Sequence, residues 1–344
     1  MRILIDPTLA SELPASPANL GPLGLFVLLG LAGVLTWAAA VWYTYQRLTS
    51  PHRRGIGYAV YKGLPQSPAD LPNSAGSAPL RFSLWEHVTT RGESLPVFDI
   101  QGGDSTGPIV VLCHGWGGSR FTMWARVGVH LPRASRILSL DLPGHGDTSR
   151  RSRSALGMTE PAELCALLNK LLPHHESSVM PVAVPPALVL HGFSLGAGVC
   201  IAAAAARSGL APALVIAEAP YRLPQTPASA VMAEAGLPRT GSLRAAIWLA
   251  ALRAGASGPQ IVRAGGSFDR AQFASKVTCP LLVIHGERDT ICPAADGREI
   301  AQAAPRGHFV QIEGAGHQDL WDEPFAPHTT AAVYAALERL TSAR

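Results

Sequence analysis

A serine flanked by glycines stands between an apolar run and an alanine-rich stretch. Residues 187–191 (ALVLH) lead into GFSLG (192–196), and the residues that follow favour a helix. A serine on such a sharp strand-to-helix turn needs small neighbours, because the strained backbone crowds both sides of it. The helix also points its first amides at the position where negative charge develops in acyl transfer. The pattern predicts that Ser194 is a nucleophile; the alternative is a serine that only caps the helix.

Two titratable residues that could activate this serine follow later apolar runs. Asp289 comes after residues 281–285, and His317 comes shortly after residues 309–312. Nucleophile, acid and histidine in this chain order form a known triad arrangement. We expect His317 to accept the serine proton, and Asp289 to orient the imidazole and stabilise its charged form. Glu218 (in VIAEAP) is the alternative acid.

A second glycine-rich turn, HGWGGS (114–119), follows the apolar run 108–113. Glycines let the backbone come close to a ligand. We expect the backbone amides of Trp116 and Leu195 to form an oxyanion hole, in which each donor contributes about 2.7–4 kcal/mol of transition-state stabilisation. The alternative is a tight turn that only packs. Trp116 and Phe193 are also expected to line the substrate pocket.

The elements that must position these residues alternate along the chain. Short apolar runs typical of strands buried on both faces lie at 108–113, 136–140, 187–191, 213–217, 281–285 and 309–312. Stretches that favour helices lie between them, at 122–130, 160–172, 195–208, 294–304 and 326–340. Residues 81–89 and 94–101 are expected to open the sheet as an antiparallel pair. The order predicts an α/β fold, a mostly parallel central sheet covered by helices on both faces. Ligands of such sheets bind beyond the carboxyl ends of the strands.

Residues 80–344 resemble the α/β-hydrolase superfamily of serine esterases and lipases. They carry HGWGGS (114–119), DLPGHGDT (141–148), GFSLG (192–196), HGERD (285–289) and GAGH (314–317), in the family's order and at similar spacing. This sequence has Phe193 where many relatives have His, and Thr148 where a serine is frequent; neither departure touches the triad. The resemblance implies esterase, lipase, thioesterase, amidase or peptidase-like chemistry on a small-molecule ester or acyl substrate. It implies no metal and no other cofactor.

The alternation of elements stops between residues 220 and 275. In the family that these residues resemble, an insertion here forms a small helical cap over the site. Residues 242–252 (SLRAAIWLAAL) begin with a serine suited to cap a helix and continue with apolar residues, which predicts a cap helix. Trp248, with Ile247 and Leu252, is expected to line an acyl pocket; the alternative is packing onto the core.

The front of the chain is apolar and free of charge between Glu12 and Arg47. Residues 23–43 are long enough to cross a bilayer as a helix. Interfacial aromatics gather at the end of this stretch and basic residues follow, namely Trp42, Tyr43, Tyr45, Arg47, Arg53, Arg54 and Lys62. The apolar stretch predicts a single-pass transmembrane helix, and the basic residues after it place the bulk of the chain on the cytoplasmic side. A cleaved signal peptide and a buried soluble helix are the alternatives.

Composition bounds the remaining possibilities. The 344 residues carry a formal net charge of +4 without a dense basic run interleaved with aromatics, which argues against nucleic acid as a partner. The five cysteines have no C-x-x-C spacing, which leaves zinc and redox motifs unsupported. We expect an N-terminal segment (1–19), a transmembrane helix (20–45), a juxtamembrane linker (46–79) and a hydrolase domain (80–344, cap about 220–275). Within the linker, residues 63–79 are expected to be a flexible spacer.

The functional hypothesis is a serine hydrolase that cleaves a carboxylic ester through an acyl-enzyme, acting on a lipid-like or amphipathic substrate beside the membrane. An amidase, peptidase or thioesterase with the same triad is one alternative. A catalytically inactive, membrane-tethered binding protein of the same fold is the other. The sequence predicts no oligomeric state.

Overall fold

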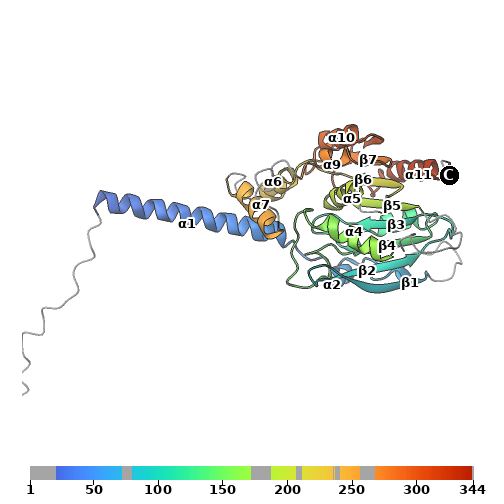
Figure 1. The fold of residues 1–344 in the computed structure, drawn as a ribbon, viewed down its shortest axis with the longest axis horizontal. Coiled ribbons are helices and arrows are strands. Elements are labelled where there is room, and N and C mark those ends of the chain that lie inside the picture. Colours follow the sequence, from blue (N-terminus) through green and yellow to red (C-terminus); the bar gives the residue numbers. More distant parts are fainter. Residues whose placement is uncertain are drawn as a thin grey trace, which may run out of the picture.

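One mixed sheet forms the core of the computed structural model, which describes residues 21–71, 80–171, 187–206, 211–234, 236, 241–255 and 268–342. Its eight strands lie in the order β1-β2-β4-β3-β5-β6-β7-β8 (Figure 1). Their bounds are β1 Phe82–Val88, β2 Ser94–Gln101, β3 Ile109–Cys113, β4 Arg136–Leu140, β5 Leu188–Phe193, β6 Leu214–Glu218, β7 Leu281–Gly286 and β8 Gly307–Ile312. β2 is antiparallel to β1 and to β4, and all other neighbours are parallel. The predicted antiparallel opening and mostly parallel sheet are confirmed.

Helices cover both faces of the sheet. One face carries α4 (Glu160–Leu171), α5 (Leu195–Ala205), α9 (Arg270–Ala274) and α10 (Ala294–Ala303), and the other carries α2 (Ile56–Lys62), α3 (Trp124–His130) and α11 (Ala326–Ser342). Successive side chains of β3 alternate between the two layers: Val111 packs in the first, and Val110 and Leu112 in the second. Covering on both sides explains why β3, β6 and β7 are buried along their whole length.

The cap consists of α6 (Gln225–Glu234) and α7 (Ser242–Arg253) within the described residues. Much of the rest of the predicted cap range, residues 235, 237–240 and 256–267, lies outside them. The cap has a small core of its own, built from Ala228, Met232, Leu243, Ala246, Ile247 and Ala250. Tyr45 and Leu48 from the first helix of the chain complete that core. The cap and the end of this helix therefore form one packed unit.

That first helix, α1 (Pro22–Thr49), extends away from the rest of the molecule (Figure 1). Its most apolar 18-residue window has a mean hydropathy of 2.2 and is not buried anywhere. By length and composition the helix can span a bilayer. Its last turns are different, because Tyr45 and Leu48 are only 2% and 3% exposed.

The expected linker differs from the structure. α1 continues to Thr49, four residues beyond its predicted end, and the following residues lie on the hydrolase domain. Arg53 donates to the carbonyl oxygen of Ser149 (2.7 Å), and Trp124 donates to that of Pro65 (2.9 Å). These partners are distant in sequence, so a local pattern of prolines and polar residues does not reveal them. Residues 72–79 of the predicted spacer, and the N-terminal segment 1–19, lie outside the described residues.

The first turn of α5 packs directly on the end of β3. A Cβ added to Gly196 would lie 2.0 Å from the carbonyl oxygen of Cys113, and both groups are backbone. This approach brings the residue before α5 to the edge of the sheet where the strands end. A side chain at position 196 cannot be accommodated without moving α5 or β3.

Gly196→Ala is therefore expected to lower the free energy of unfolding by about 1–3 kcal/mol, the usual cost of overpacking. Gly128→Ala is the matched control, because a Cβ at this α3 position meets nothing within 4 Å. Alanine is the better helix former there, by up to about 1 kcal/mol. Thermal unfolding of both variants followed by circular dichroism checks this; equal unfolding midpoints would contradict the close packing.

Candidate active site

Ser194 occupies a strained turn between β5 and α5. Its backbone has φ 50° and ψ −108°, a region that residues with a Cβ rarely adopt. The Ser194 amide donates to the carbonyl oxygen of Glu218 at the end of β6 (2.8 Å). The glycine-flanked sequence thus forms the sharp strand-to-helix turn that was expected, with Leu195 as the first residue of α5.

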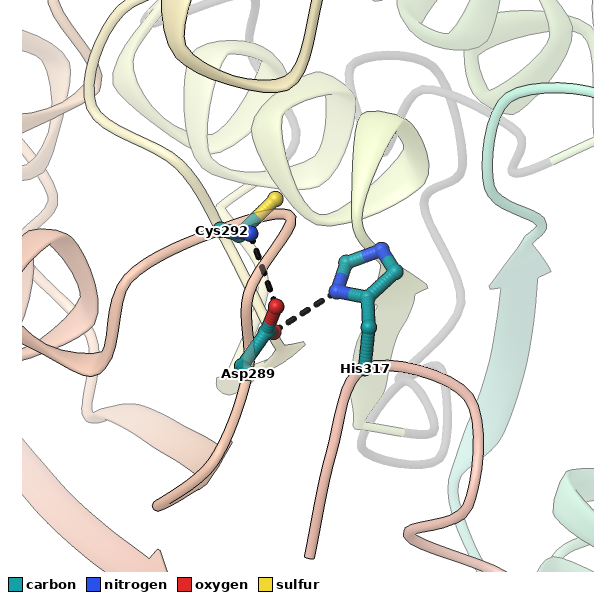
Figure 2. A group of neighbouring side chains, drawn as sticks. All are labelled: Asp289, Cys292 and His317. Carbon is teal, nitrogen blue, oxygen red and sulfur yellow. Dashed lines mark hydrogen bonds and ion pairs between the residues drawn. The ribbon is translucent and has the colours of Figure 1, made fainter. Parts of the chain in front are cut away.

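The three residues predicted to act together are brought together. The Ser194 hydroxyl lies 3.2 Å from His317 Nε2, and His317 Nδ1 lies 2.6 Å from Asp289 Oδ2. Figure 2 shows the second of these hydrogen bonds. Asp289 follows β7 and His317 follows β8, so all three groups lie beyond the carboxyl ends of parallel strands. This series of hydrogen bonds allows a proton to move from the Ser194 hydroxyl to the His317 imidazole.

The environment of Asp289 keeps its carboxylate charged. Its second oxygen accepts from the amides of Ile291 (2.9 Å) and Cys292 (2.7 Å). Burial by itself raises the pKa of Asp289, but the hydrogen bonds from His285 and His317 outweigh burial and lower the pKa to about 2. An ionised Asp289 fixes the proton of His317 on Nδ1, which leaves Nε2 free to accept the serine proton.

The alternative acid, Glu218, lies in a separate network behind the turn. It forms a buried ion pair with Arg126, and it accepts from His191 Nε2 (2.7 Å) and from the indole of Trp321 (2.8 Å). Burial raises the pKa of Glu218, but the charges of Arg126 and His191 lower it to about 2. The structure brings Asp289, and not Glu218, to His317.

This network continues to a second histidine. His130 Nε2 lies 2.8 Å from His191 Nδ1, and both rings are completely buried. Burial lowers the pKa of His130 well below its usual value, so the ring is neutral. Sequence reasoning missed the network, because its members come from α3, β5, β6 and the loop after β8. No short-range spacing links them.

A cavity of about 310 Å³ opens above Ser194. Trp116, Phe193, Leu195 and His317 line it, and Trp116 and Phe193 are two of the residues predicted to line the substrate pocket. Its wall also includes three residues from the end of α1 and the segment that follows, namely Leu48, His52 and Arg54. Their place in the site was missed, because they fall in the predicted juxtamembrane linker, residues 46–79.

Trp248 does not lie where it was expected. It is 44% exposed and is not among the residues that line this cavity. The side of α7 that is buried carries Leu243, Ala246, Ile247 and Ala250, and it packs on α6 and α1. Trp248 points away from this side because successive helical residues are about 100° apart. Of the two interpretations of this apolar stripe, packing applies and the pocket lining does not, because the stripe forms the core of the cap.

The two amides predicted to form an oxyanion hole lie at the same cavity. Among the described residues, neither the Trp116 amide nor the Leu195 amide donates to a protein acceptor. Both residues line the cavity with Ser194, so the amides are available to a substrate oxygen. The Trp116 indole is engaged differently, because it donates to the carbonyl oxygen of Leu48 (2.8 Å). This bond ties the glycine-rich turn to the last turn of α1.

Cys292 lies beside Asp289 and His317 (Figure 2). The ligand atoms of Asp289, Cys292 and His317 lie within 4.8 Å of one another, as in some metal sites. Burial raises the pKa of the Cys292 thiol well above its usual value, which disfavours the thiolate that metals bind. The carboxylate and His317 Nδ1 are already hydrogen-bonded to each other, which suits proton transfer better than metal binding. The spacing of the cysteines in the sequence gave no sign that Cys292 lies at the site.

Known proteins share this architecture. Esterase Pf2001 of Pyrococcus furiosus is 20% identical, with a TM-score of 0.56 over 79% of this chain and 98% of its own. An esterase from Thermogutta terrifontis is 21% identical, with a TM-score of 0.51 over 75% of this chain and 99% of its own. A bacterial membrane phospholipase A is 16% identical, with a TM-score of 0.50 over 93% of this chain and 98% of its own. At such identities the likeness concerns the fold.

Sequence similarity gives the family. The chain is 37% identical over 60 residues to BpoC of Mycobacterium tuberculosis, whose name describes a non-heme bromoperoxidase. That match spans 17% of this chain and 23% of BpoC, about a quarter of its length. A sequence model of the family described as alpha/beta hydrolases matches residues 110–333, well over half of the chain. The chain therefore belongs to the alpha/beta hydrolase family.

Proposed function

We propose that the protein is a serine hydrolase that cleaves carboxylic esters. The observation that carries this proposal is the hydrogen-bonded chain from Asp289 through His317 to Ser194, at the base of a cavity large enough for a substrate. Two similar structures carry the name esterase, which supports an ester as the substrate.

The proposed reaction follows from the positions of these groups. Ser194 Oγ attacks the carbonyl carbon while its proton moves to His317 Nε2. The amides of Trp116 and Leu195 donate to the negative oxygen of the tetrahedral intermediate. When the ester bond breaks, His317 gives the proton to the departing alcohol. Water then releases the acyl group, with His317 again accepting a proton.

The walls of the cavity favour a lipid-like ester. Leu48, Leu156 and Val231 offer apolar surface close to Ser194, and His52 and Arg54 add polar groups to the lining. The similar membrane phospholipase A supports the same substrate class by its name. Its likeness covers a larger share of this chain than residues 80–344 alone could provide.

An amide or thioester could use the same residues, because the leaving group is the only part that differs. Rates on matched ester, thioester and amide substrates with one acyl chain separate these reactions. A rate on the amide above that on the ester would favour an amidase.

We also propose that α1 anchors the protein in a membrane, with the hydrolase domain on the cytoplasmic side. The helix carries aromatic residues where its apolar stretch ends and Arg47 in its last turn, which fits an interface followed by a basic flank. The end of α1 contributes Leu48 to the cavity wall, so an anchored domain holds its cavity beside the bilayer.

Ser194→Ala is expected to lower kcat on a short p-nitrophenyl ester by about 10⁶, as loss of the nucleophile does in a related triad. Labelling by a fluorophosphonate should also disappear, since the probe forms its bond with the nucleophile oxygen. Ser275→Ala is the matched control, because this exposed serine follows α9 and does not line the cavity. Undiminished labelling of Ser194→Ala would remove Ser194 from the mechanism.

The variants Asp289→Asn and Glu218→Gln distinguish the roles of the two buried carboxylates. Asp289→Asn is expected to lower kcat by about 10⁴, because the amide favours the wrong tautomer of His317. Glu218→Gln leaves the charge of Arg126 buried and unpaired, which costs about 3–5 kcal/mol of stability. Its kcat per folded molecule should stay within about tenfold of the unchanged protein. Thermal unfolding and kcat of folded, gel-filtered protein check both; the reverse pattern would make Glu218 the acid.

The anchor predicts that the full chain stays in the membrane pellet after an alkaline carbonate wash, because α1 holds it in the bilayer. Release of a full-length chain would contradict the anchor, and release of a shortened chain would indicate a cleaved signal peptide. A C-terminal tag checks the orientation. In intact cells, protease should reach the tag only after the membrane is permeabilised.

A further inference from the structure

A second cavity lies at the last turn of α1, lined by Tyr45 and Thr49. It measures about 150 Å³ and shares no lining residue with the cavity above Ser194. Neighbouring residues face the two cavities: Thr49 lines this one and Leu48 the other, and Ala155 lines this one and Leu156 the other. The end of α1 thus borders both a site with the triad and a site without it.

Arginine dominates the lining of this second cavity. Arg91, Arg151, Arg153 and Arg253 surround it, against two acidic residues, Glu93 and Glu163. Within the described residues, none of the four arginines forms an ion pair. The lining therefore has an excess of positive charge, four basic side chains against two carboxylates.

Each acidic residue already has a hydrogen-bond donor. The hydroxyl of Ser152 donates to Glu93 (2.8 Å), and the hydroxyl of Thr90 donates to Glu163 (2.6 Å). Two of the arginines are held in place by neutral oxygens, Arg91 by the carbonyl of Ala254 (3.0 Å) and Arg153 by the hydroxyl of Ser50. Such bonds orient guanidinium groups without neutralising them.

More positive charge surrounds the cavity. Burial lowers the pKa of Arg53, and Asp141 and Glu93 raise it by less. The charges of Arg153 and Arg150 lower the pKa of Arg53 further. These side chains therefore repel one another across a short stretch of surface. A bound anion would relieve that repulsion, and planar guanidinium groups match the oxygen geometry of a phosphate.

The cavity also lies at a defined height along α1. Tyr45 and Thr49 line it, and Trp42 precedes them by three and seven residues, or about 5 and 10 Å along the helix axis. Aromatic residues at the end of a transmembrane helix lie at the level of the lipid headgroups. If α1 is the anchor proposed above, the arginines stand at the phosphate layer of the bilayer.

We propose that this cavity binds the phosphate group of an anionic phospholipid in the leaflet where α1 ends. The lipid occupies a site separate from the substrate cavity and is not hydrolysed there, because no triad residue lines it. It holds the domain against the membrane surface at the last turn of α1. The cavity that contains Ser194 also borders this turn.

The test uses the full chain in a nonionic detergent, with binding followed by native mass spectrometry and by the thermal unfolding midpoint. Phosphatidylglycerol, phosphatidylcholine and inorganic phosphate are added in separate titrations. Arg151→Gln/Arg253→Gln removes two charges from the cavity. Arg81→Gln/Arg339→Gln is the matched control. Arg81 directly precedes β1 and Arg339 lies in α11; both are exposed, and neither lines the cavity.

We expect one phosphatidylglycerol to bind the unchanged protein with preference over phosphatidylcholine. The cavity variant should bind it roughly 10- to 30-fold more weakly, given what each basic side chain contributes near an anionic surface. The control variant should bind as before, and hydrolysis of a soluble ester should be unchanged in both. If the double variant fails to fold, Arg151→Gln alone serves, since Arg151 has no polar partner among the described residues.

Three outcomes would overturn the proposal. Equal affinity of the cavity and control variants for phosphatidylglycerol would place the lipid elsewhere. Equal binding of phosphatidylcholine would remove the need for an anionic lipid. Tight binding of inorganic phosphate that phosphatidylglycerol does not displace would identify a site for a free anion. Because the soluble-ester assay is read separately, loss of lipid binding is distinguishable from failure of the proposed hydrolase activity.

Discussion

Ser194 is held at φ 50° and ψ −108°, a backbone conformation that costs a residue with a Cβ about 1–3 kcal/mol. Contacts with the neighbouring backbone hold Ser194 in this conformation. The amide is bound by the carbonyl of Glu218, and the next turn fits against β3 only because position 196 is glycine. The hydroxyl therefore stands clear of the sheet, 3.2 Å from His317, with the first amide of α5 beside it. The contact of Ser194 with His317 and with the cavity depends on this turn.

Two buried carboxylates serve this turn in different ways. Asp289 acts on His317 directly, through a hydrogen bond of 2.6 Å. Glu218 holds the Ser194 amide with its backbone and binds Arg126 with its side chain. Arg126 in turn lies 5.0 Å from the centre of the Phe193 ring, and that ring lies 5.1 Å from the ring of His317. The second network thus holds Ser194 and lies beside His317, but it is not part of the hydrogen-bonded series of Asp289, His317 and Ser194.

The local sequence pattern predicted much of this structure. The continuous apolar runs predicted the inner strands, since a strand covered on both faces needs no polar side. The glycine-flanked Ser194, and the positions of Asp289 and His317 after strands, predicted which side chains would meet. Contacts between distant segments were not predictable in this way. Nothing near Arg126 in the sequence indicates Glu218, and nothing near Pro65 indicates the indole of Trp124.

The errors have the same physical origin. An apolar stripe on a helix shows that one face is buried, but it does not show what covers that face. The stripe of α7 packs on α6 and α1, and Trp248 is left 44% exposed. The predicted spacer, residues 63–79, is rich in proline and polar residues, yet its start is secured to the domain by the hydrogen bond from Trp124 to Pro65 and by the packing of Leu64 and Leu71 against the core. The composition of this segment predicted a flexible spacer, whereas contacts with residues distant in sequence hold it on the domain.

The last turn of α1 connects the apolar helix to the hydrolase domain. Carbonyl oxygens at the end of a helix lack partners within it, and that of Leu48 receives the indole of Trp116. The same tryptophan lines the cavity above Ser194. A displacement of α1 relative to the domain would therefore move the glycine-rich turn, and with it a proposed donor to the reacting oxygen. Because Leu48 and Tyr45 are also part of the cap core, the cap would follow the same displacement. The apolar helix is thus a structural part of the site, and whatever fixes its angle to the domain also fixes the geometry around Ser194.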